Sequence, residues 1–138
     1  MNAFFDSSAF AKRYIEERGS DEVDDICRAT DRLALSSICV PEIISALNRR
    51  VREKKVSRAD YVTIKARLLD DVRDVELINI TDDVIAHSML ILEQNPVRAM
   101  DSLHIACAHA WTTDVFVTAD GDQAKAAHKL GLKCRFIS

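Results

Sequence analysis

Residues 2–8 read Asn-Ala-Phe-Phe-Asp-Ser-Ser, and this short stretch sets a pattern that the rest of the chain follows. An apolar run of strand length ends at an acidic residue, and two serines of the kind that cap helices come next. A strand-length run that ends at an acidic residue returns at residues 115–121, Val-Phe-Val-Thr-Ala-Asp-Gly. Strands that lead directly into helices predict a parallel sheet whose strands are joined by helical crossovers.

Between these two segments, apolar runs of strand length alternate with stretches of helical periodicity. Gly19 stands where the first helix would take its C-terminal cap, and Gly131 stands at the same place in the last one. The other strands are expected at 33–36, 75–80 and 134–137, and the other helices at 20–29, from Pro41 toward Lys55, and at 57–73, 81–95, 98–111 and 120–130. We therefore predict an α/β protein of three layers (α/β/α), with a mostly parallel central sheet of about five strands.

Length and composition limit the alternatives. With 138 residues, 48% of them hydrophobic and 30% charged, the chain fits a single globular domain over 1–138. No stretch approaches the roughly 20 apolar residues of a membrane span, and the N-terminus lacks the features of a secretion signal, so we expect a cytoplasmic protein. The four cysteines lack C-x-x-C spacing and are expected to be reduced core residues. The net charge of −3 means that any polyanion must be met by a local basic patch.

Four carboxylates occupy places that the predicted topology brings to one edge of the sheet. Asp6 and Asp120 follow apolar strands, while Glu42 and Asp101 stand near the starts of apolar helices. Each acid alone is explained by helix capping or by the helix dipole. Together in one cleft, however, four carboxylates would repel one another by about 3 kcal/mol per pair at ~5 Å. The group therefore predicts a bound cation.

Mg²⁺ or Mn²⁺ suits an all-oxygen group of ligands, and such ions activate water and orient it for attack on a phosphodiester. On this reasoning Asp6, Asp101 and Asp120 are metal ligands, and Glu42 holds a metal-bound water or a second cation. The hydroxyls of Ser7 and Thr118 are candidates for hydrogen bonds to the acids, although ordinary cap and strand roles explain them equally well.

Four segments carry a family resemblance that covers nearly the whole chain: Phe-Phe-Asp-Ser-Ser-Ala-Phe-Ala-Lys-Arg-Tyr (4–14), Pro-Glu-Ile-Ile-Ser-Ala-Leu (41–47), Arg-Ala-Met-Asp-Ser-Leu-His-Ile-Ala-Cys-Ala (98–108) and Val-Phe-Val-Thr-Ala-Asp-Gly-Asp (115–122). At these residues the chain resembles the PIN-domain ribonucleases, most closely the VapC-type toxins of VapBC toxin–antitoxin pairs.

The resemblance implies a Mg²⁺- or Mn²⁺-dependent endoribonuclease whose catalytic acids are Asp6, Glu42, Asp101 and Asp120. It also implies an RNA substrate, a toxin homodimer and a small antitoxin whose C-terminal tail covers the active site. One departure is Asp122, where family members often carry a basic or other polar residue. Asp122 is therefore a second candidate for the metal ligand beside Asp120, although a solvated residue in the first turn of a helix is the interpretation that we favour.

The sequence leaves several alternatives open. The one basic island, residues 49–58, either contacts RNA phosphates or is a solvated helix end. Arg13 and Arg98 are candidates nearer the acids, and we interpret His104 as a packed helix residue rather than a metal ligand. The chain lacks the acidic pair that a receiver domain has after its first strand. It also lacks the D-x-D motif of haloacid-dehalogenase phosphatases, because Asp6 is followed by Ser7 and Ser8. A housekeeping RNA-processing nuclease and a degenerate PIN fold that only binds remain as rivals to the toxin.

Overall fold

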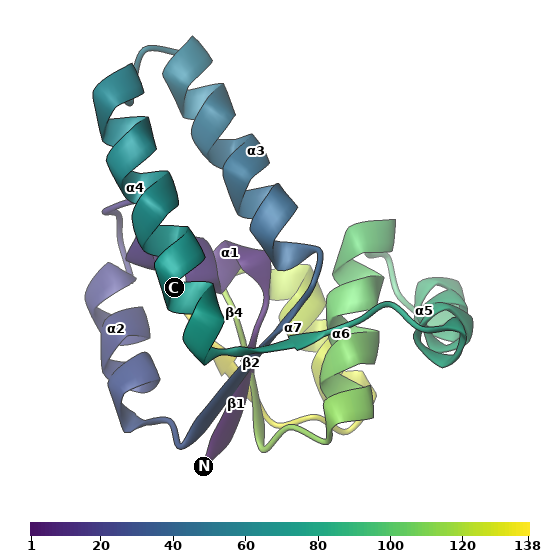
Figure 1. Cartoon of the computed structure of the whole chain (residues 1–138). Coiled ribbons are helices and arrows are strands. Elements are labelled where there is room, and N and C mark those ends of the chain that lie inside the picture. Colours follow the sequence, from purple (N-terminus) through teal and green to yellow (C-terminus); the bar gives the residue numbers. More distant parts are fainter.

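Five short strands form one parallel sheet in the computed structural model, which describes residues 1–138 (Figure 1). The sheet has the order β3-β2-β1-β4-β5, so the chain starts in the middle and adds strands first on one side and then on the other. Both the number of strands and their direction confirm the sequence prediction. The strands are β1 (Asn2–Phe5), β2 (Arg32–Ser36), β3 (Glu76–Ile78), β4 (Val115–Thr118) and β5 (Cys134–Phe136).

Seven α-helices cover the two faces of this sheet and complete the predicted three layers (Figure 1). The first four pack on one face, and the last three pack on the other. None of them is both long enough and apolar enough to cross a membrane. The helices are α1 (Ser7–Phe10), α2 (Ser20–Ala29), α3 (Cys39–Arg52), α4 (Arg58–Asp71), α5 (Asp82–Gln94), α6 (Ala99–Trp111) and α7 (Gly121–Lys129).

Each central strand supplies both cores, because successive side chains of a strand point to opposite faces. Phe5 and Val117 lie in the core beneath the first four helices. Phe4 and Phe116 lie in the core beneath α5, α6 and α7, where their rings stack with centroids 6.1 Å apart. Burial on both faces explains why these strands are apolar without alternation, which is typical of parallel sheets.

Helices α3 and α4 form a hairpin that extends away from the sheet (Figure 1). The fourteen residues of α3 span about 21 Å at 1.5 Å per residue. Its buried residues, Cys39, Ile43 and Leu47, all belong to the first nine positions, so the far part of the helix lies outside the core. One end of α3 therefore stands at the sheet while the other reaches beyond it.

The structure corrects the expected end of the first helix. We predicted that Gly19 caps this helix, but α1 continues only as a 3₁₀ turn from Ala11 to Arg13 and ends there. Gly19 instead precedes α2, with φ of 93°. A Cβ at this position would come within 2.5 Å of the Ile137 side chain, so a close approach and a left-handed backbone both require glycine. The prediction for Gly131 is confirmed, since it follows α7 with φ of 95°.

Smaller differences concern element ends and cysteines. Helix α3 starts at Cys39, two residues before the predicted Pro41, and the edge strand β3 covers only three of the six predicted residues. All four thiols are free, as expected, but only Cys39 and Cys107 are fully buried. The other two are half-buried, so they are only partly core residues.

Candidate active site

A cleft of about 700 Å³ opens beside the carboxyl ends of the central strands. Each strand that ends there leads into a helix, so the first turn of α3 brings Glu42 to the cleft and the N-cap of α7 brings Asp120. The first turn of α6 brings Asp101. Asp6 caps α1 next to the cleft but has no exposed surface. The predicted acids thus gather at one edge of the sheet, with Asp6 as the buried member.

Asp6 is held entirely by donors of the protein. Its Oδ1 accepts hydrogen bonds from the Ala9 amide (2.9 Å) and the Ser8 hydroxyl (2.8 Å). Its Oδ2 accepts from the Ser8 hydroxyl at 2.9 Å and from the Thr118 hydroxyl at 2.5 Å. Burial nevertheless raises the pKa of Asp6 above its usual value, and these hydrogen bonds only partly oppose the shift. The Thr118 hydroxyl therefore supports an acid, as was considered from the sequence.

Glu42 is held by two side chains from other elements. Its Oε1 accepts a hydrogen bond from the Ser7 hydroxyl at 2.7 Å and lies 2.5 Å from Nε2 of His104, a buried residue of α6. Partial burial pushes the pKa of Glu42 upward, but the His104 and Ser7 contacts outweigh it, and the net pKa lies below the usual range. Glu42 is therefore ionised at neutral pH, with Oε2 free of protein hydrogen bonds.

Asp101 has protein contacts on both carboxylate oxygens. Its Oδ1 accepts a hydrogen bond at 3.0 Å from the side-chain amide of Gln123 on α7. Its Oδ2 accepts from the Arg98 backbone amide at 3.2 Å and lies 3.5 Å from the Arg98 guanidinium. Asp101 is 7% exposed, so the cleft reaches only part of this carboxylate.

Asp120 and Asp122 differ clearly in position. Asp120 lines the cleft, and its Oδ1 caps α7 by accepting the backbone amides of Asp122 (2.9 Å) and Gln123 (3.0 Å). Its Oδ2 has no protein partner. The side chain of Asp122 is exposed in the first turn of α7 and does not line the cleft.

The cleft continues from these acids along α3 to part of the basic island. Arg49, Arg50 and Lys55 line it, and Lys12 faces them from the turn after α1. The remaining cations of the island, Arg52, Lys54 and Arg58, lie outside it. One hollow surface therefore joins an acidic end at the sheet to a basic end on the helical hairpin.

Several site residues escaped the sequence reasoning. No sequence pattern marks Ser8 or Gln123, and the interpretation of His104 as a packed residue does not include its contact to Glu42. The only signal for His104 was its spacing of one turn after Asp101. Conversely, Arg13 was considered near the acids, but it lies beside Asp24 and Asp71 in a different hollow. Arg98 does line the cleft.

The donors at the acidic end suit a hard divalent cation that keeps most of its waters. No group of three or more acidic, histidine or cysteine side chains is arranged to hold a metal directly. Mg²⁺, however, is usually bound by one or two carboxylates, with waters and substrate phosphates completing its shell. Asp101 and Asp120 both line the cleft, and Oδ2 of Asp120 accepts no protein hydrogen bond, so these two carboxylates fit that form of binding. Oε2 of Glu42 also has no protein partner and could accept a hydrogen bond from a water of such an ion. These side chains do not form a closed metal site made of protein ligands alone.

Comparison with known proteins supports the same fold. The sequence profile of the PIN domain family matches residues 3–129. No curated protein matches the chain.

Similar solved structures include VapC20 of Mycobacterium tuberculosis, described as a Sarcin-Ricin loop cleaving toxin. That protein is 18% identical, with a TM-score of 0.71 over 90% of this chain and 94% of its own. Others are VapBC2 of Rickettsia felis bound to a promoter DNA fragment (14% identity, TM-score 0.70, 100% of both chains) and a toxin–antitoxin complex of Klebsiella pneumoniae (18%, 0.68, 88% of this chain and 90% of that one).

Proposed function

Because this chain belongs to the PIN domain family, we propose that it is a metal-dependent endoribonuclease that serves as the toxin of a toxin–antitoxin pair. The observation that carries the proposal is the cleft itself. Glu42, Asp101 and Asp120 line its acidic end, and the same cleft continues into a basic end that suits a polyanion. The similarity in fold to a toxin that cleaves the Sarcin-Ricin loop supports RNA as the substrate.

The acidic residues have distinct tasks in this proposal. A divalent ion, Mg²⁺ or Mn²⁺, would supply an activated water and charge stabilisation at the phosphate. Asp101 and Asp120 are the carboxylates that would hold it. Asp6 was predicted as a third ligand, but it has no exposed surface and protein donors occupy both of its oxygens, so in this proposal it supports the site from beneath. Glu42 is ionised, and its free Oε2 accepts a hydrogen bond from the attacking water and orients that water toward phosphorus.

The surrounding residues keep these carboxylates in place. His104 and Ser7 fix one oxygen of Glu42, a residue that lines the cleft, and the other oxygen has no protein partner. Gln123 holds one oxygen of Asp101, and the Arg98 backbone amide holds the other. Such contacts to the acids are of the kind that orient metal-binding carboxylates.

Cleavage of a labelled RNA pool tests the activity directly. We expect the purified protein to cut RNA with Mg²⁺ or Mn²⁺ and not with EDTA. Asp101→Asn keeps the shape of the side chain but removes its charge, so it should stay folded and lose cleavage. Full cleavage by the Asn variant under matched metal would contradict the assignment, and RNA binding without cleavage by the wild type would favour the degenerate binding module.

The proposed partners are a second copy of the chain and a small antitoxin. A guanidinium pairs well with carboxylates, and Arg98 already lies 3.5 Å from Asp101 at the cleft. An arginine from an antitoxin tail would exploit the same pairing near Glu42 and Asp101 and exclude metal and substrate together. Such a toxin would act on RNA in the cytoplasm.

Expression tests this assignment. We expect the active protein alone to arrest growth, and co-expression with the neighbouring small reading frame to restore growth and give a co-purifying complex. Harmless expression of an active enzyme without a partner would favour a housekeeping RNA-processing nuclease.

A further inference from the structure

We propose that the basic end of the cleft is a subsite for the RNA backbone, with Arg49 as its principal contact, about 10 Å along α3 from the acidic end where the bond is cleaved. The inference rests on the proposed function, because it takes the acidic end as the place of cleavage. It separates the cations of residues 49–58 into those that bind substrate and those that are merely solvated.

One face of α3 forms a continuous wall of the cleft. Glu42, Ser45, Ala46 and Arg49 all line it, and they follow the i, i+3, i+4, i+7 spacing of a single helix face. Ser45 and Ala46, which lie between the acid and the arginine, have short side chains. A polymer that passes along this face therefore meets little obstruction between the two ends.

The length of this wall sets the position of the subsite. Seven residues separate Glu42 from Arg49, which corresponds to about 10 Å along the helix axis. Arg49 is thus placed well away from the acidic end, where it would contact a phosphate other than the one that is cleaved.

Arg49 is the cation at this end that is free to bind an anion. Lys12 and Arg50 share Glu17, at 3.2 and 3.5 Å, and Lys55 lies 3.3 Å from Glu53. Arg49 is exposed and has no ion pair or side-chain hydrogen bond within the protein. Four cations face two acids here, so the basic end keeps a net positive charge although the chain carries −3.

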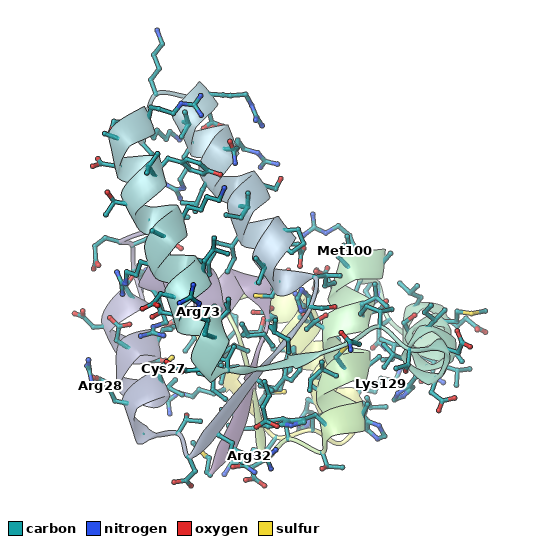
Figure 2. The ribbon with its side chains drawn as sticks, viewed as in Figure 1. Cys27, Arg28, Arg32, Arg73, Met100 and Lys129 are labelled. Atoms are coloured by element: carbon teal, nitrogen blue, oxygen red, sulfur yellow. The ribbon has the colours of Figure 1, made fainter.

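The chain also offers a matched control. Arg52 belongs to the same helix and carries the same charge three residues later, but it does not line the cleft. Figure 2 shows nitrogen-ended side chains around the far end of the α3–α4 hairpin, so general attraction of RNA to this region would involve both arginines. Binding at a subsite, by contrast, would involve Arg49 and not Arg52.

The test measures binding of a fluorescein-labelled, 20-nucleotide single-stranded RNA of mixed sequence by fluorescence anisotropy. The parent protein carries Asp101→Asn, which prevents cleavage during titration. For a single strand, one phosphate contact contributes about 0.7 to the slope of log affinity against log salt, which is roughly fivefold in affinity at 0.1 M salt. We expect Arg49→Ala to lower the salt slope by about 0.7 and the RNA affinity roughly fivefold. The RNA affinity of Arg52→Ala should stay within twofold of the parent.

Equal losses for the two variants, no loss for Arg49→Ala, or no RNA binding by the parent would each overturn the subsite. If Arg49→Ala weakens binding of a labelled oligo-aspartate peptide but not of RNA, the basic end serves an acidic protein segment and the proposal is wrong.

Kinetics keep this inference distinct from the proposed activity. In the active protein, Arg49→Ala should raise KM and leave kcat unchanged. If the wild type cleaves no RNA while the contrast between Arg49 and Arg52 persists in binding, the nuclease assignment fails and the RNA-binding subsite stands.

Discussion

Replacing Thr118 by valine removes one hydroxyl from beneath the cleft and leaves the shape of a fully buried strand residue nearly unchanged. That hydroxyl donates a hydrogen bond to Asp6 at 2.5 Å and accepts one from the Asp120 amide at 3.0 Å. A hydrogen bond to a charged group contributes about 1.5–3 kcal/mol to stability. Because Asp6 is completely buried, no solvent is present to screen or replace the lost donor.

We therefore expect Thr118→Val to lower the free energy of unfolding by about 2–3 kcal/mol at a pH above the raised pKa of Asp6, where its carboxylate is charged. At about 4 °C per kcal/mol for a chain of this size, the melting temperature falls by roughly 8–12 °C. Urea unfolding followed by circular dichroism measures the change, together with Asp6→Asn and the double variant. In the Asn background the lost bond is a neutral one, so the loss should shrink to about 1 kcal/mol.

Acidification supplies an independent check of the same reasoning. Burial raises the folded-state pKa of Asp6. On acidification this carboxyl therefore becomes protonated before the pH has fallen to 3.8, the ordinary pKa of an aspartate. Once it is neutral, the Thr118 hydroxyl no longer stabilises a charge, and the gap between wild type and Thr118→Val should narrow as the pH falls through that pKa. An equal loss in both backgrounds and at every pH would show that the hydroxyl does not act through the charge of Asp6.

Other predictions concern the remaining acids and the turn before α2. Asp120→Asn should abolish metal-dependent RNA cleavage while Asp122→Asn retains most of it, because only Asp120 lines the cleft. The reverse order of cleavage rates would reassign the metal ligand to Asp122. The folded-state pKa of Glu42 is depressed, so its contribution to stability is present above its unfolded pKa near 4.5 and is lost as the pH falls through the folded pKa. The difference in urea midpoint between wild type and Glu42→Gln should accordingly narrow in acid, and a constant difference would contradict this. Gly19→Ala should lower the free energy of unfolding by about 1–2 kcal/mol because of the left-handed backbone, and further because the new Cβ would lie 2.5 Å from Ile137. An unchanged melting temperature would contradict this strain.

The acids of the site could be placed from the sequence because strand ends mark an edge of the sheet. Asp6 and Asp120 follow apolar runs directly, and parallel connections bring such positions together whatever the helices do in between. Glu42 and Asp101 could be placed by the same topology, since each stands in the first turn of a helix. In both cases local chain order determines the location.

The arrangement of side chains around those acids depends on how the helices are rotated and packed. His104 reaches Glu42 across 62 residues only because the buried face of α6 is turned toward the start of α3. In Figure 2, Met100 marks the first turn of α6, and Arg32 marks the start of β2 at the opposite edge of the sheet. The first turn of α6 therefore lies at the edge where β2 ends and α3 begins. Periodicity identifies an apolar face, but it does not say which neighbour that face will meet.

The sequence by itself determined the α/β alternation, the parallel sheet and the edge at which the acids gather, because strand length, caps and apolar runs are local properties. Only the tertiary structure decided which charges share the cleft. It placed Arg49 inside and Arg52 outside, although both belong to one helix, and it placed Arg13 against Asp24 and away from the acids. The physical reason is that a side chain's direction follows from the rotation of its helix, and tertiary packing sets that rotation.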